Sequence, residues 1–161
     1  MADIREALEV DFDQIWEIFH QIVSAGETYT IPRNTSKKEA NQIWMKQPQK
    51  TYVCVENKQV LGTYYLKQNH SGGGGHVCNC GYMVAMEAEG KGLGTMMCVH
   101  SQKIAKELGY KAMQFNLVVV SNKQAVSLWT KLGFDTVGKI PKAFDHPKIG
   151  YVDALVMHKW L

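Results

Sequence analysis

The chain has 161 residues, 45% of them hydrophobic, and a formal net charge of +3. This length and this hydrophobic content suit one buried core, so we expect a single domain over residues 1–161. The 18 lysine and arginine residues are scattered along the chain. Because nucleic-acid-binding proteins carry a dense basic patch, we expect no nucleic acid as a partner, whereas a small anionic ligand stays compatible.

The first residues lack the basic and then apolar pattern of a signal peptide, and no apolar stretch is long enough to span a bilayer. We therefore expect a cytoplasmic protein without a membrane partner. In that compartment the cysteines should be reduced thiols that are mostly buried. They are Cys54, Cys78, Cys80 and Cys98.

The first quarter of the chain predicts a strand followed by two helices. Residues 4–8 alternate between apolar and polar side chains, as a short strand does. An amphipathic helix is expected from Asp11, with an apolar face formed by Ile15, Ile18, Phe19 and Ile22. After a loop over residues 26–34, Ser36 can cap a second helix, because Glu39 stands in the capping-box position.

The next residues predict three strands and a glycine-rich connection. Residues 51–56 and 60–67 are rich in Val, Tyr and Leu, and the short segment between them indicates a hairpin. Ordering the Ser-Gly-Gly-Gly-Gly segment over residues 71–75 into regular structure would cost much conformational entropy, so we expect a flexible connection there. Residues 76–86 again show the extended pattern of a strand.

The C-terminal half predicts two helices and three strands. Apolar residues recur at helical spacing over residues 93–108, and residues 112–120 form a β-rich run. Residues 121–124 are expected to open another helix with a capping box, and residues 134–140 and 151–159 to form the last strands. The prediction is a mixed α/β fold, of the α+β kind, with about seven strands and about four helices.

His76, Cys78 and Cys80 alternate along a predicted strand and so would share one face, where they can be imagined as metal ligands. However, the chain has no CxxC or HxxxH pair that would complete the tetrahedral ligand set of a structural zinc site. We therefore expect no metal and interpret both cysteines as small hydrophobic residues.

The segment from residue 84 to residue 95 is the most informative part of the chain. Here a predicted strand gives way to glycines that open the following helix. The first N–H groups of a helix have no partner within it, and the helix dipole places positive charge there, so a pyrophosphate would be favoured. The N–H groups that would point outward belong to Lys91, Gly92, Leu93, Gly94 and Thr95.

Other glycine-rich motifs fit this segment less well. The dinucleotide-binding fingerprint is Gly-x-Gly-x-x-Gly with an acidic residue about 20 positions further on. Here the third glycine comes one position early, and residues 111–114 contain no acid. No Gly-Lys-Ser/Thr follows a suitable spacer, so a P-loop is excluded. An ordinary tight turn without a ligand stays the alternative.

Residues 89–94 resemble the coenzyme A signature of the GNAT N-acetyltransferase superfamily, Arg/Gln-x-x-Gly-x-Gly/Ala. A second GNAT element, Asn-x-x-Ala/Ser followed by Tyr-x-Lys-x-Gly-Phe, is similar to residues 122–125 and 129–134. The resemblance covers nearly the whole chain. It implies a GNAT fold with a mixed, mostly antiparallel sheet, and an acyltransferase that uses acetyl-CoA as co-substrate without a metal.

The resemblance also implies how the acetyl group would be transferred. The pantetheine arm of the cofactor would pair with the backbone of Met83 and Val84, and the N–H of Val84 would polarise the acetyl carbonyl. Trp129 would lie beside the cofactor. An amine would then attack directly, so that orientation and stabilisation of the developing charge are the protein's main contributions.

A closer similarity is to fungal enzymes that acetylate proline analogues such as azetidine-2-carboxylate. By that similarity Asn79 and Asn116 would hold the acceptor's carboxylate, and Asn122 would contact the cofactor near the thioester as a catalytic residue. Tyr29 lies in a loop that often lines the acceptor site in this superfamily. A small-molecule amine, an amino acid or a proline analogue, is therefore the expected substrate. The shared strings are residues 76–79 with Gly81, 115–118, Asn122 with Val126, Leu128 and Trp129, and 152–154.

Each of these residues has a structural alternative. Asn79 and Asn116 lie in otherwise apolar strands, where a buried amide can bond to neighbouring backbone. Asn122 at a helix start is an ordinary cap. Trp129 stands where the family often has a tyrosine acid, and it can equally be a core aromatic. General-acid catalysis would be lost at this indole, although a thiol with a pKa of about 8.5 is a tolerable leaving group.

Two further departures leave the activity open. Glu89 stands where the family usually has Arg or Gln, and a carboxylate repels a pyrophosphate, although Lys91 can offset it. No general base stands out among the candidates, which are His70, His76, Asp145, His146 and Asp153. The rival functions are therefore a coenzyme A-binding sensor without turnover and a protein or peptide N-acetyltransferase. Dimers are common among similar proteins, so a homodimer is compatible with the sequence.

Overall fold

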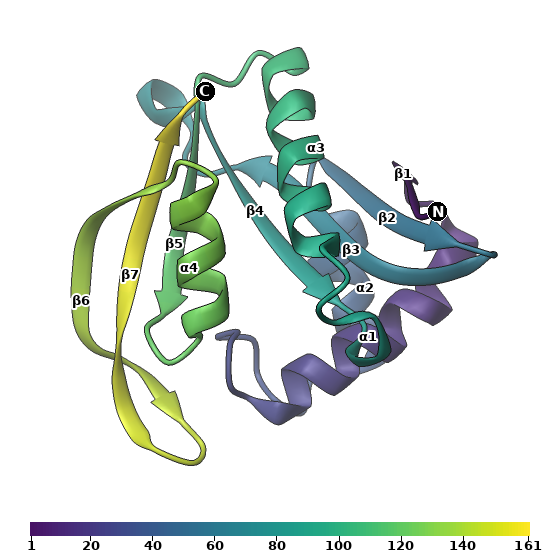
Figure 1. Cartoon of the computed structure of the whole chain (residues 1–161), viewed down its shortest axis with the longest axis horizontal. Helices are drawn as coiled ribbons and strands as arrows, with labels where there is room; N and C mark the ends of the chain where they lie inside the picture. Colours follow the sequence, from purple (N-terminus) through teal and green to yellow (C-terminus); the bar gives the residue numbers. More distant parts are fainter.

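The computed structural model describes residues 1–161 and contains one seven-stranded sheet (Figure 1). The strand order is β1-β2-β3-β4-β5-β7-β6, and every neighbouring pair is antiparallel except β4 and β5. The predicted mixed, mostly antiparallel sheet is thus confirmed. The strands are β1 (Asp3–Glu6), β2 (Lys50–Glu56), β3 (Gln59–Gln68), β4 (Val77–Val84), β5 (Ala112–Val119), β6 (Asp135–His146) and β7 (Gly150–Trp160).

The predicted four α-helices are present and cover the sheet from both faces. In β3, Thr63 accepts a hydrogen bond from Trp44, just after α2 (3.0 Å), whereas the next residue, Tyr64, bonds to His100 of α3 (2.8 Å). Because successive side chains of a strand point to opposite faces, α2 and α3 lie on opposite sides of the sheet. None of the helices combines the length and apolarity needed to cross a lipid bilayer. The helices are α1 (Phe12–Ala25), α2 (Lys37–Asn41), α3 (Leu93–Glu107) and α4 (Lys123–Lys131).

The sequence signals for the first two helices are confirmed. Ser36 and Glu39 form the predicted capping box: the Ser36 hydroxyl accepts from the Glu39 N–H (3.2 Å), and the Glu39 carboxylate accepts from the Ser36 N–H (2.7 Å). The helix then continues as a π-helical turn over Gln42–Lys46. The buried face of α1 includes Ile15, Ile18 and Phe19, as the apolar spacing predicts.

An ion pair fixes the chain where β1 leads into α1. Both oxygens of the buried Asp11 carboxylate accept hydrogen bonds from the Arg5 guanidinium (2.8 Å each), and one also accepts from the N–H of Leu8 (2.7 Å). The bond from Arg5 holds the pKa of Asp11 below its usual value. The sequence analysis placed Asp11 at the helix start, and the structure adds the partner on β1.

Two turns of the N-terminal half differ in how well the sequence describes them. Asn57 and Lys58 have φ angles of 50° and 65°, as a type I′ turn requires, so the predicted hairpin between β2 and β3 is confirmed. The predicted flexible connection over residues 71–75 is instead a single 3-10 turn over Gly72–Gly74. Short-range backbone hydrogen bonds close this turn, which glycine content alone does not reveal.

The structure corrects the predicted end of β6. We expected this strand to end at Ile140, but it continues to His146. Pro141 has no N–H to donate, and it is tolerated because β6 is one of the two edge strands of the sheet. A bulge interrupts the pairing there, and the N–H of Lys142 donates to Asp153 of β7 (2.9 Å).

The structure also corrects the predicted start of α4. Asn122 alone caps this helix, since its Oδ1 accepts from the N–H of Ala125 (3.3 Å), and the capping box expected over residues 121–124 does not form. Ser121 lies just before the cap, and its Oγ is buried without a hydrogen-bond partner.

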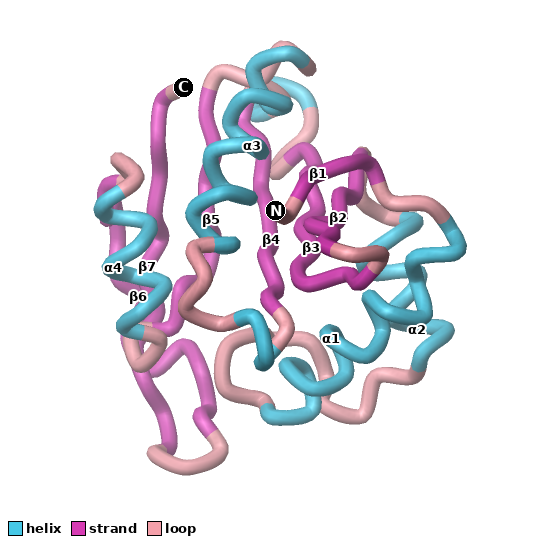
Figure 2. The backbone as a smooth tube through the Cα atoms, turned by 45° about the vertical axis from the view of Figure 1, so that its right-hand side comes forward, coloured by secondary structure: helices cyan, strands magenta, loops and turns pink.

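The two parallel strands stay together for only two residues each. Val77 pairs with Ala112 and Cys78 with Met113, after which β4 and β5 diverge (Figures 1 and 2). We call this opening the V, the strands β1 to β4 the N-terminal arm, and the strands β5 to β7 the C-terminal arm. Beyond the two pairs, the backbone groups on the facing edges of β4 and β5 must find partners other than each other.

Candidate active site

The free edge of β4 turns selected backbone groups toward the V. The N–H of Ala85 donates to the carbonyl of Leu61 in β3 (2.8 Å). Since backbone groups alternate sides along a strand, those of Met83 also face β3, whereas those of Tyr82 and Val84 face the V. Of the two residues predicted to meet the cofactor through their backbone, Val84 is the one whose N–H points into this opening.

Tyr29 reaches the same edge from the loop between α1 and α2. Its hydroxyl donates to the carbonyl of Tyr82 (2.7 Å), and its ring meets that of Trp44 edge-on, with ring centroids 6.1 Å apart. Burial raises the pKa of the Tyr29 phenol well above its ordinary value, so the group is neutral and donates its proton. The structure therefore places this predicted acceptor residue against β4, on the α1 and α2 side of the V.

The glycine-rich junction before α3 leaves its first N–H groups without caps. Gly92 is the N-cap residue, with φ of 78°, and no side chain bonds to the first turn. The N–H groups of Leu93, Gly94 and Thr95 therefore have no partner within the helix. A Cβ built on Gly90 or Gly92 would meet no atom within 4 Å, so open space lies beside these amides.

The same junction brings α3 and α4 into close approach. A Cβ built on Gly94 would lie 3.1 Å from Leu128 Cδ2 of α4, so glycine allows the two helices to meet at this point. Glu89 and Lys91 are both exposed, and neither takes part in an ion pair within the chain. The residues directly before and after Gly90 therefore both carry an exposed charge without an ion-pair partner.

Asn122 caps α4, which is its structural alternative, and still has donors free for its predicted role. Its Oδ1 is used as the cap of α4, while its Nδ2 makes no hydrogen bond within the chain. A carboxamide carries two N–H donors, so they remain available for a ligand at the end of β5. The buried, unpaired hydroxyl of Ser121 lies next to it in the chain. Sequence reasoning considered Ser121 only as a cap.

Trp129 lies in an aromatic cluster between α4 and the sheet. Its ring centroid is 5.0 Å from that of Tyr82 and 5.1 Å from that of Phe115, and Phe134 completes the group. The side chain is only 9% exposed. The alternative of a core aromatic therefore describes its packing, and a contact with the cofactor stays a prediction.

Asn79 bridges the two arms where they begin to separate. Its Nδ2 donates to the carbonyl of Gln114 in β5 (2.9 Å), and its Oδ1 accepts from the Tyr65 hydroxyl (3.2 Å). Tyr65 can lie over β4 because Gly81 has no side chain: a Cβ there would be 2.5 Å from the Tyr65 ring. Burial raises the pKa of Tyr65 to about 12. Sequence reasoning missed Tyr65, although the Gly81 opposite it was a signal.

Asn116 belongs to a directional chain of amides on β5. Gln114 Nε2 donates to Asn116 Oδ1 (3.0 Å), and Asn116 Nδ2 donates to Asn69 Oδ1 (2.7 Å). The chain ends at Asn69 Nδ2, which is buried and has no partner. Asn116 itself is exposed. The structure thus links both predicted substrate asparagines through Gln114, and it adds Asn69, which nothing in the sequence pattern singled out.

The candidate general bases lie outside this group of residues. Asp153 accepts from the N–H of Lys142 (2.9 Å) and pairs with Lys139 (3.8 Å), so its carboxylate already has two partners. His146 accepts from the N–H of Lys148 in the turn between β6 and β7 (3.2 Å). The others, His70, His76 and Asp145, are exposed. No base candidate is therefore bonded to a residue of the V described above.

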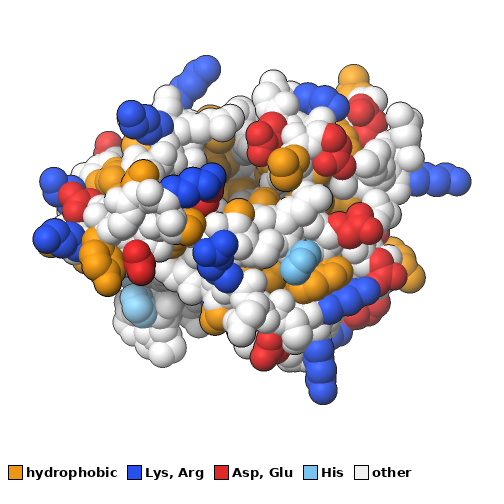
Figure 3. Space-filling model, turned by 90° about the horizontal axis from the view of Figure 1, so that it is seen from below, with side chains coloured by type: hydrophobic (Ala, Val, Ile, Leu, Met, Phe, Trp, Pro, Cys, Tyr) orange, Lys and Arg blue, Asp and Glu red, His pale blue; other side chains and the backbone are white.

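The open end of the V has a charged rim. Lys148, in the turn between β6 and β7, pairs with Glu27 in the loop between α1 and α2 (2.6 Å), which links that loop to the C-terminal arm across the open end. The hydrogen bond from Lys148 lowers the pKa of Glu27 below its usual value. Figure 3 looks at this end of the molecule and shows a hollow with hydrophobic side chains, surrounded by charged ones.

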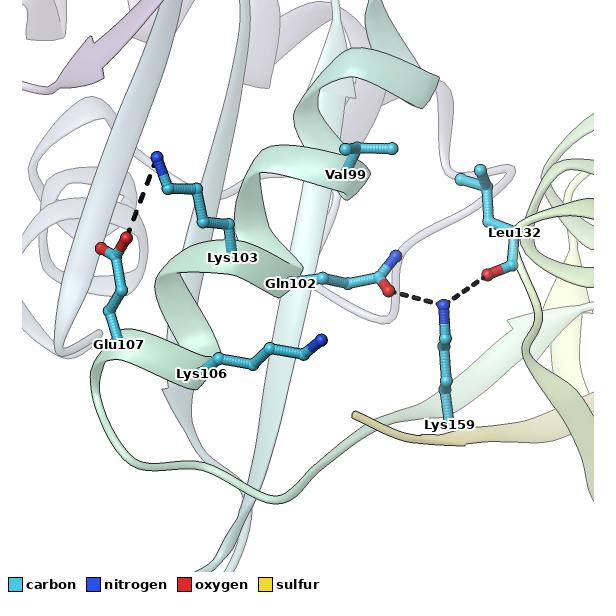
Figure 4. A pocket seen from close by; sticks show the side chains of 7 residues that line it. All are labelled: Val99, Gln102, Lys103, Lys106, Glu107, Leu132 and Lys159. Atoms are coloured by element: carbon cyan, nitrogen blue, oxygen red, sulfur yellow. Dashed lines mark hydrogen bonds and ion pairs between the residues drawn. The ribbon is translucent and has the colours of Figure 1, made fainter.

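A separate cavity of about 510 Å³ lies at the opposite end of α3 (Figure 4). Lys159 crosses it and donates to Gln102 Oε1 (2.7 Å) and to the carbonyl of Leu132 (2.9 Å). Lys159 therefore links α3 to the C-terminal end of α4, where the helix dipole favours positive charge. The remaining lining residues are Val99, Lys103, Lys106 and Glu107.

Comparisons with known proteins bear on this arrangement. The model of the acetyltransferase (GNAT) family matches residues 11–134. The N-acetyltransferase aca1 of Schizosaccharomyces pombe is 29% identical over 153 residues, which cover 83% of this chain and 72% of the relative.

Two solved structures show the same fold. A GCN5-related N-acetyltransferase from Kribbella flavida is 40% identical, with a TM-score of 0.95 and coverage of 99% of this chain and 98% of the other. A phosphinothricin acetyltransferase from Sinorhizobium meliloti, in complex with AcCoA, is 20% identical, with a TM-score of 0.87 and coverage of 99% and 88%. The second likeness is one of fold alone.

Proposed function

Because this chain belongs to the GNAT acetyltransferase family, we propose that it transfers an acetyl group from acetyl-CoA to the amine of a small molecule, an amino acid or a proline analogue. One observation carries the proposal. The free edge of β4 and the uncapped first turn of α3 both present N–H groups without partners, in one segment of chain between Val84 and Thr95. Such groups need acceptors, and the thioester and phosphates of acetyl-CoA supply them.

The residues present fit this cofactor. The N–H groups of Leu93, Gly94 and Thr95 would hold the pyrophosphate, and the open space beside Gly90 and Gly92 lets it approach the backbone closely. Two further unpaired groups stand at the end of β5, Nδ2 of Asn122 and the buried Oγ of Ser121. The S. meliloti structure of the same fold is described as a complex with AcCoA, which supports the assignment.

The protein would act mainly by orientation and by fixed dipoles. When bound, acetyl-CoA supplies a thioester whose carbonyl carbon an uncharged amine attacks as the carbon–sulfur bond breaks and the thiolate leaves. The N–H of Val84 is held in direction by β4 and would stabilise negative charge on the acetyl oxygen. The Nδ2 of Asn122 would hold the cofactor near the reacting atoms. The packed ring of Trp129 would form the wall beside it.

Acid and base catalysis by side chains is not needed for this proposal. A thiol has a pKa of about 8.5, so its thiolate can leave without being protonated first. The attacking amine must be uncharged, and its proton passes to solvent, since the base candidates are exposed or already bonded. We therefore expect the rate to rise with pH as the free amine fraction of the acceptor rises.

The geometry favours a small acceptor over a peptide. Tyr29 is bonded to β4 on the α1 and α2 side of the V, and the pair between Glu27 and Lys148 crosses its open end. A peptide chain would have to displace one or both contacts. Asn79 and Asn116 lie on this side, where the proposal places the acceptor's carboxylate.

The experiment is an acceptor screen that follows free thiol release. The protein is mixed with acetyl-CoA and a panel of amino acids, proline analogues and short peptides, and titration calorimetry measures acetyl-CoA binding in parallel. Thiol release with a small amine supports the proposal. Binding without turnover on any acceptor would identify a sensor, and turnover on peptides alone a peptide acetyltransferase. Absence of acetyl-CoA binding by folded protein would refute all three.

A further inference from the structure

Lys67 is the only charged residue in the three strands that meet at the V. The strands β3, β4 and β5 contain no aspartate, glutamate, arginine or other lysine. Lys67 stands opposite Asn79 in the register of β3 and β4. Its ammonium lies 5.1 Å from the centroid of the Tyr65 ring. A single positive charge is therefore placed on the face that carries Tyr65 and Asn79.

This charge has no protein counterion. None of the eight ion pairs in the structure involves Lys67, and its ammonium makes no hydrogen bond within the chain. Seven of the other ammonium or guanidinium groups on the surface are paired with carboxylates in these bridges, so acidic partners are common elsewhere in the molecule. The positive charge beside Tyr65 is therefore not neutralised by an ion pair, and a bound anion would be attracted to it.

The neighbouring side-chain amides add N–H donors, which, like the Lys67 ammonium, favour an anion as partner. Asn69 follows Lys67 by two residues, and its N–H continues the β3 ladder by bonding to Val77, so the two side chains project from one face. The chain of bonds from Gln114 through Asn116 ends at the unpaired Nδ2 of Asn69. Amides aligned in one direction polarise one another, which strengthens the last donor. An acceptor of hydrogen bonds is the partner that this end lacks.

Asn79 cannot be the main donor of this group. Its Nδ2 is used by the carbonyl of Gln114 and its Oδ1 by Tyr65. With both of its polar atoms used by these partners, Asn79 positions the strands of the V in this arrangement. The groups left for an anion are the ammonium of Lys67 and the donor at Asn69, with the exposed Asn116 beside them.

We propose that Lys67, together with the amide of Asn69, selects an acceptor that carries a carboxylate. The inference rests on the proposed function, because it takes the α1 and α2 side of the V as the place of the acceptor. Lys67 is then a specificity-determining residue for the amine substrate, and Asn79 is a positioning residue. An amine that carries no carboxylate, or an amino acid whose carboxylate is blocked as an amide, would offer no negative charge to pair with the Lys67 ammonium.

The test compares matched acceptors in matched variants. L-proline and L-azetidine-2-carboxylate are each compared with their carboxamides, and kcat/KM is measured by thiol release. Expressing each variant's acid-to-amide ratio relative to wild type cancels the different basicity of the amines. We expect Lys67→Met to lower this ratio about tenfold or more, as loss of a charged hydrogen bond does. Lys67→Arg should keep it within about twofold, since the charge is retained.

The control variant is Lys106→Met, which removes an exposed lysine of α3 on the opposite side of the sheet and should leave the ratio unchanged. Methionine keeps most of the apolar stem of lysine, so folding should survive in both variants. Thermal melting and acetyl-CoA affinity by calorimetry verify this. An unchanged ratio in Lys67→Met with normal melting would overturn the inference.

A second readout does not require turnover. Side-chain amide signals in ¹H–¹⁵N spectra of the protein without cofactor are followed while L-proline or L-prolinamide is added. We expect L-proline to shift the amides of Asn69 and Asn116 in wild type and not in Lys67→Met, and L-prolinamide to have little effect in either. If the acceptor screen fails but this shift occurs, the proposed function falls and the carboxylate site stands. No shift with L-proline in wild type would overturn the site itself.

Discussion

The two arms of the sheet differ in how deeply their strands are buried. In the N-terminal arm, β2, β3 and β4 each contain a run of at least four buried residues. In the C-terminal arm, β5 has five buried residues among its eight, but β6 has only one, Phe144, and β7 has two. Helices cover the N-terminal arm on both faces, whereas α4 is the one helix of the C-terminal arm (Figure 1). Stability therefore comes chiefly from the N-terminal arm, and the C-terminal arm supplies the other wall of the V.

The largest expected contrast is between a buried and an exposed aromatic residue. Trp44 is fully buried on the N-terminal arm and bonds to Thr63, whereas Tyr151 of β7 is 71% exposed. We expect Trp44→Ala to cost about 3–5 kcal/mol of unfolding free energy and Tyr151→Ala no more than about 0.5 kcal/mol. Urea denaturation measures both. Equal losses of unfolding free energy would show that the two arms contribute equally to stability.

The bridge between the arms gives the next largest effect. Asn79→Ala leaves the carbonyl of Gln114 and the hydroxyl of Tyr65 without their partner, which should cost about 1–3 kcal/mol. Gln68→Ala, at the exposed end of β3, is the matched control: it removes only an exposed bond to the carbonyl of Gly75 (3.2 Å) and should melt close to wild type. Denaturation is combined with acceptor kinetics. A raised acceptor KM with unchanged stability would mean that Asn79 meets the substrate directly and does not hold the arms.

A pH-dependent effect on stability is expected where β1 leads into α1. The pKa of Asp11 is lower in the folded chain because of Arg5, so the unfolded chain binds more protons as the pH falls. The contribution of Asp11, about 1 kcal/mol, is complete above the unfolded pKa of about 3.9 and is lost progressively as the pH falls from there through the lower pKa of the folded chain. The difference in melting temperature between Asp11→Asn and wild type should therefore be constant from about pH 7 to about pH 5 and shrink as the pH falls below about 4.

Asp13→Asn serves as the control for that series. Asp13 also belongs to α1 and pairs with Lys37, but its side chain is 83% exposed. Solvent screens such a pair, so we expect no comparable pH-dependent difference from wild type. If the melting temperatures of both variants depend on pH in the same way relative to wild type, burial of Asp11 is not the cause of its effect on stability.

The smallest effect on stability is expected at the rim of the V. Glu27 and Lys148 form an exposed pair between the arms, so Lys148→Ala should leave the melting temperature unchanged within error. Its effect should appear in function, as a broader range of acceptors that includes short peptides. Raising the salt concentration in wild type should act in the same direction, because salt screens exposed charges. If Lys148→Ala still accepts only small amines, the pair between Glu27 and Lys148 does not exclude peptides.

The sequence predicted the elements with local signals and missed those that depend on distant partners. The capping box of Ser36, the apolar face of α1 and the glycines before α3 are short-range patterns, and each is confirmed. The predicted end of β6 at Ile140 was wrong. A proline such as Pro141 is usually excluded from the interior of a sheet, and only the strand order shows that β6 lies at an edge, where a proline is tolerated. Strand position is set by tertiary pairing, which one sequence does not display.

The candidate site shows the same division. Glycines and an asparagine at helix starts are short-range signals, so the residues proposed to hold the cofactor can be named from the sequence. The proposed acceptor side depends on residues brought together from β3, β4 and β5. Lys67, Asn69 and Tyr65 have no motif, and their importance follows from charge, an unpaired donor and the space above Gly81. The partners of Asn79 likewise come from β3 and β5.

The bulge in β6 also bears on how copies of this chain can associate. An unpaired edge strand offers a row of backbone donors and acceptors on which another strand can be added. In β6 that row is broken in the middle, because Pro141 lacks an N–H and the N–H of Lys142 is turned to Asp153. Exposed lysines at 139 and 142 add charge repulsion between two such edges. Growth of the sheet from one molecule into the next is therefore disfavoured at the edge formed by β6.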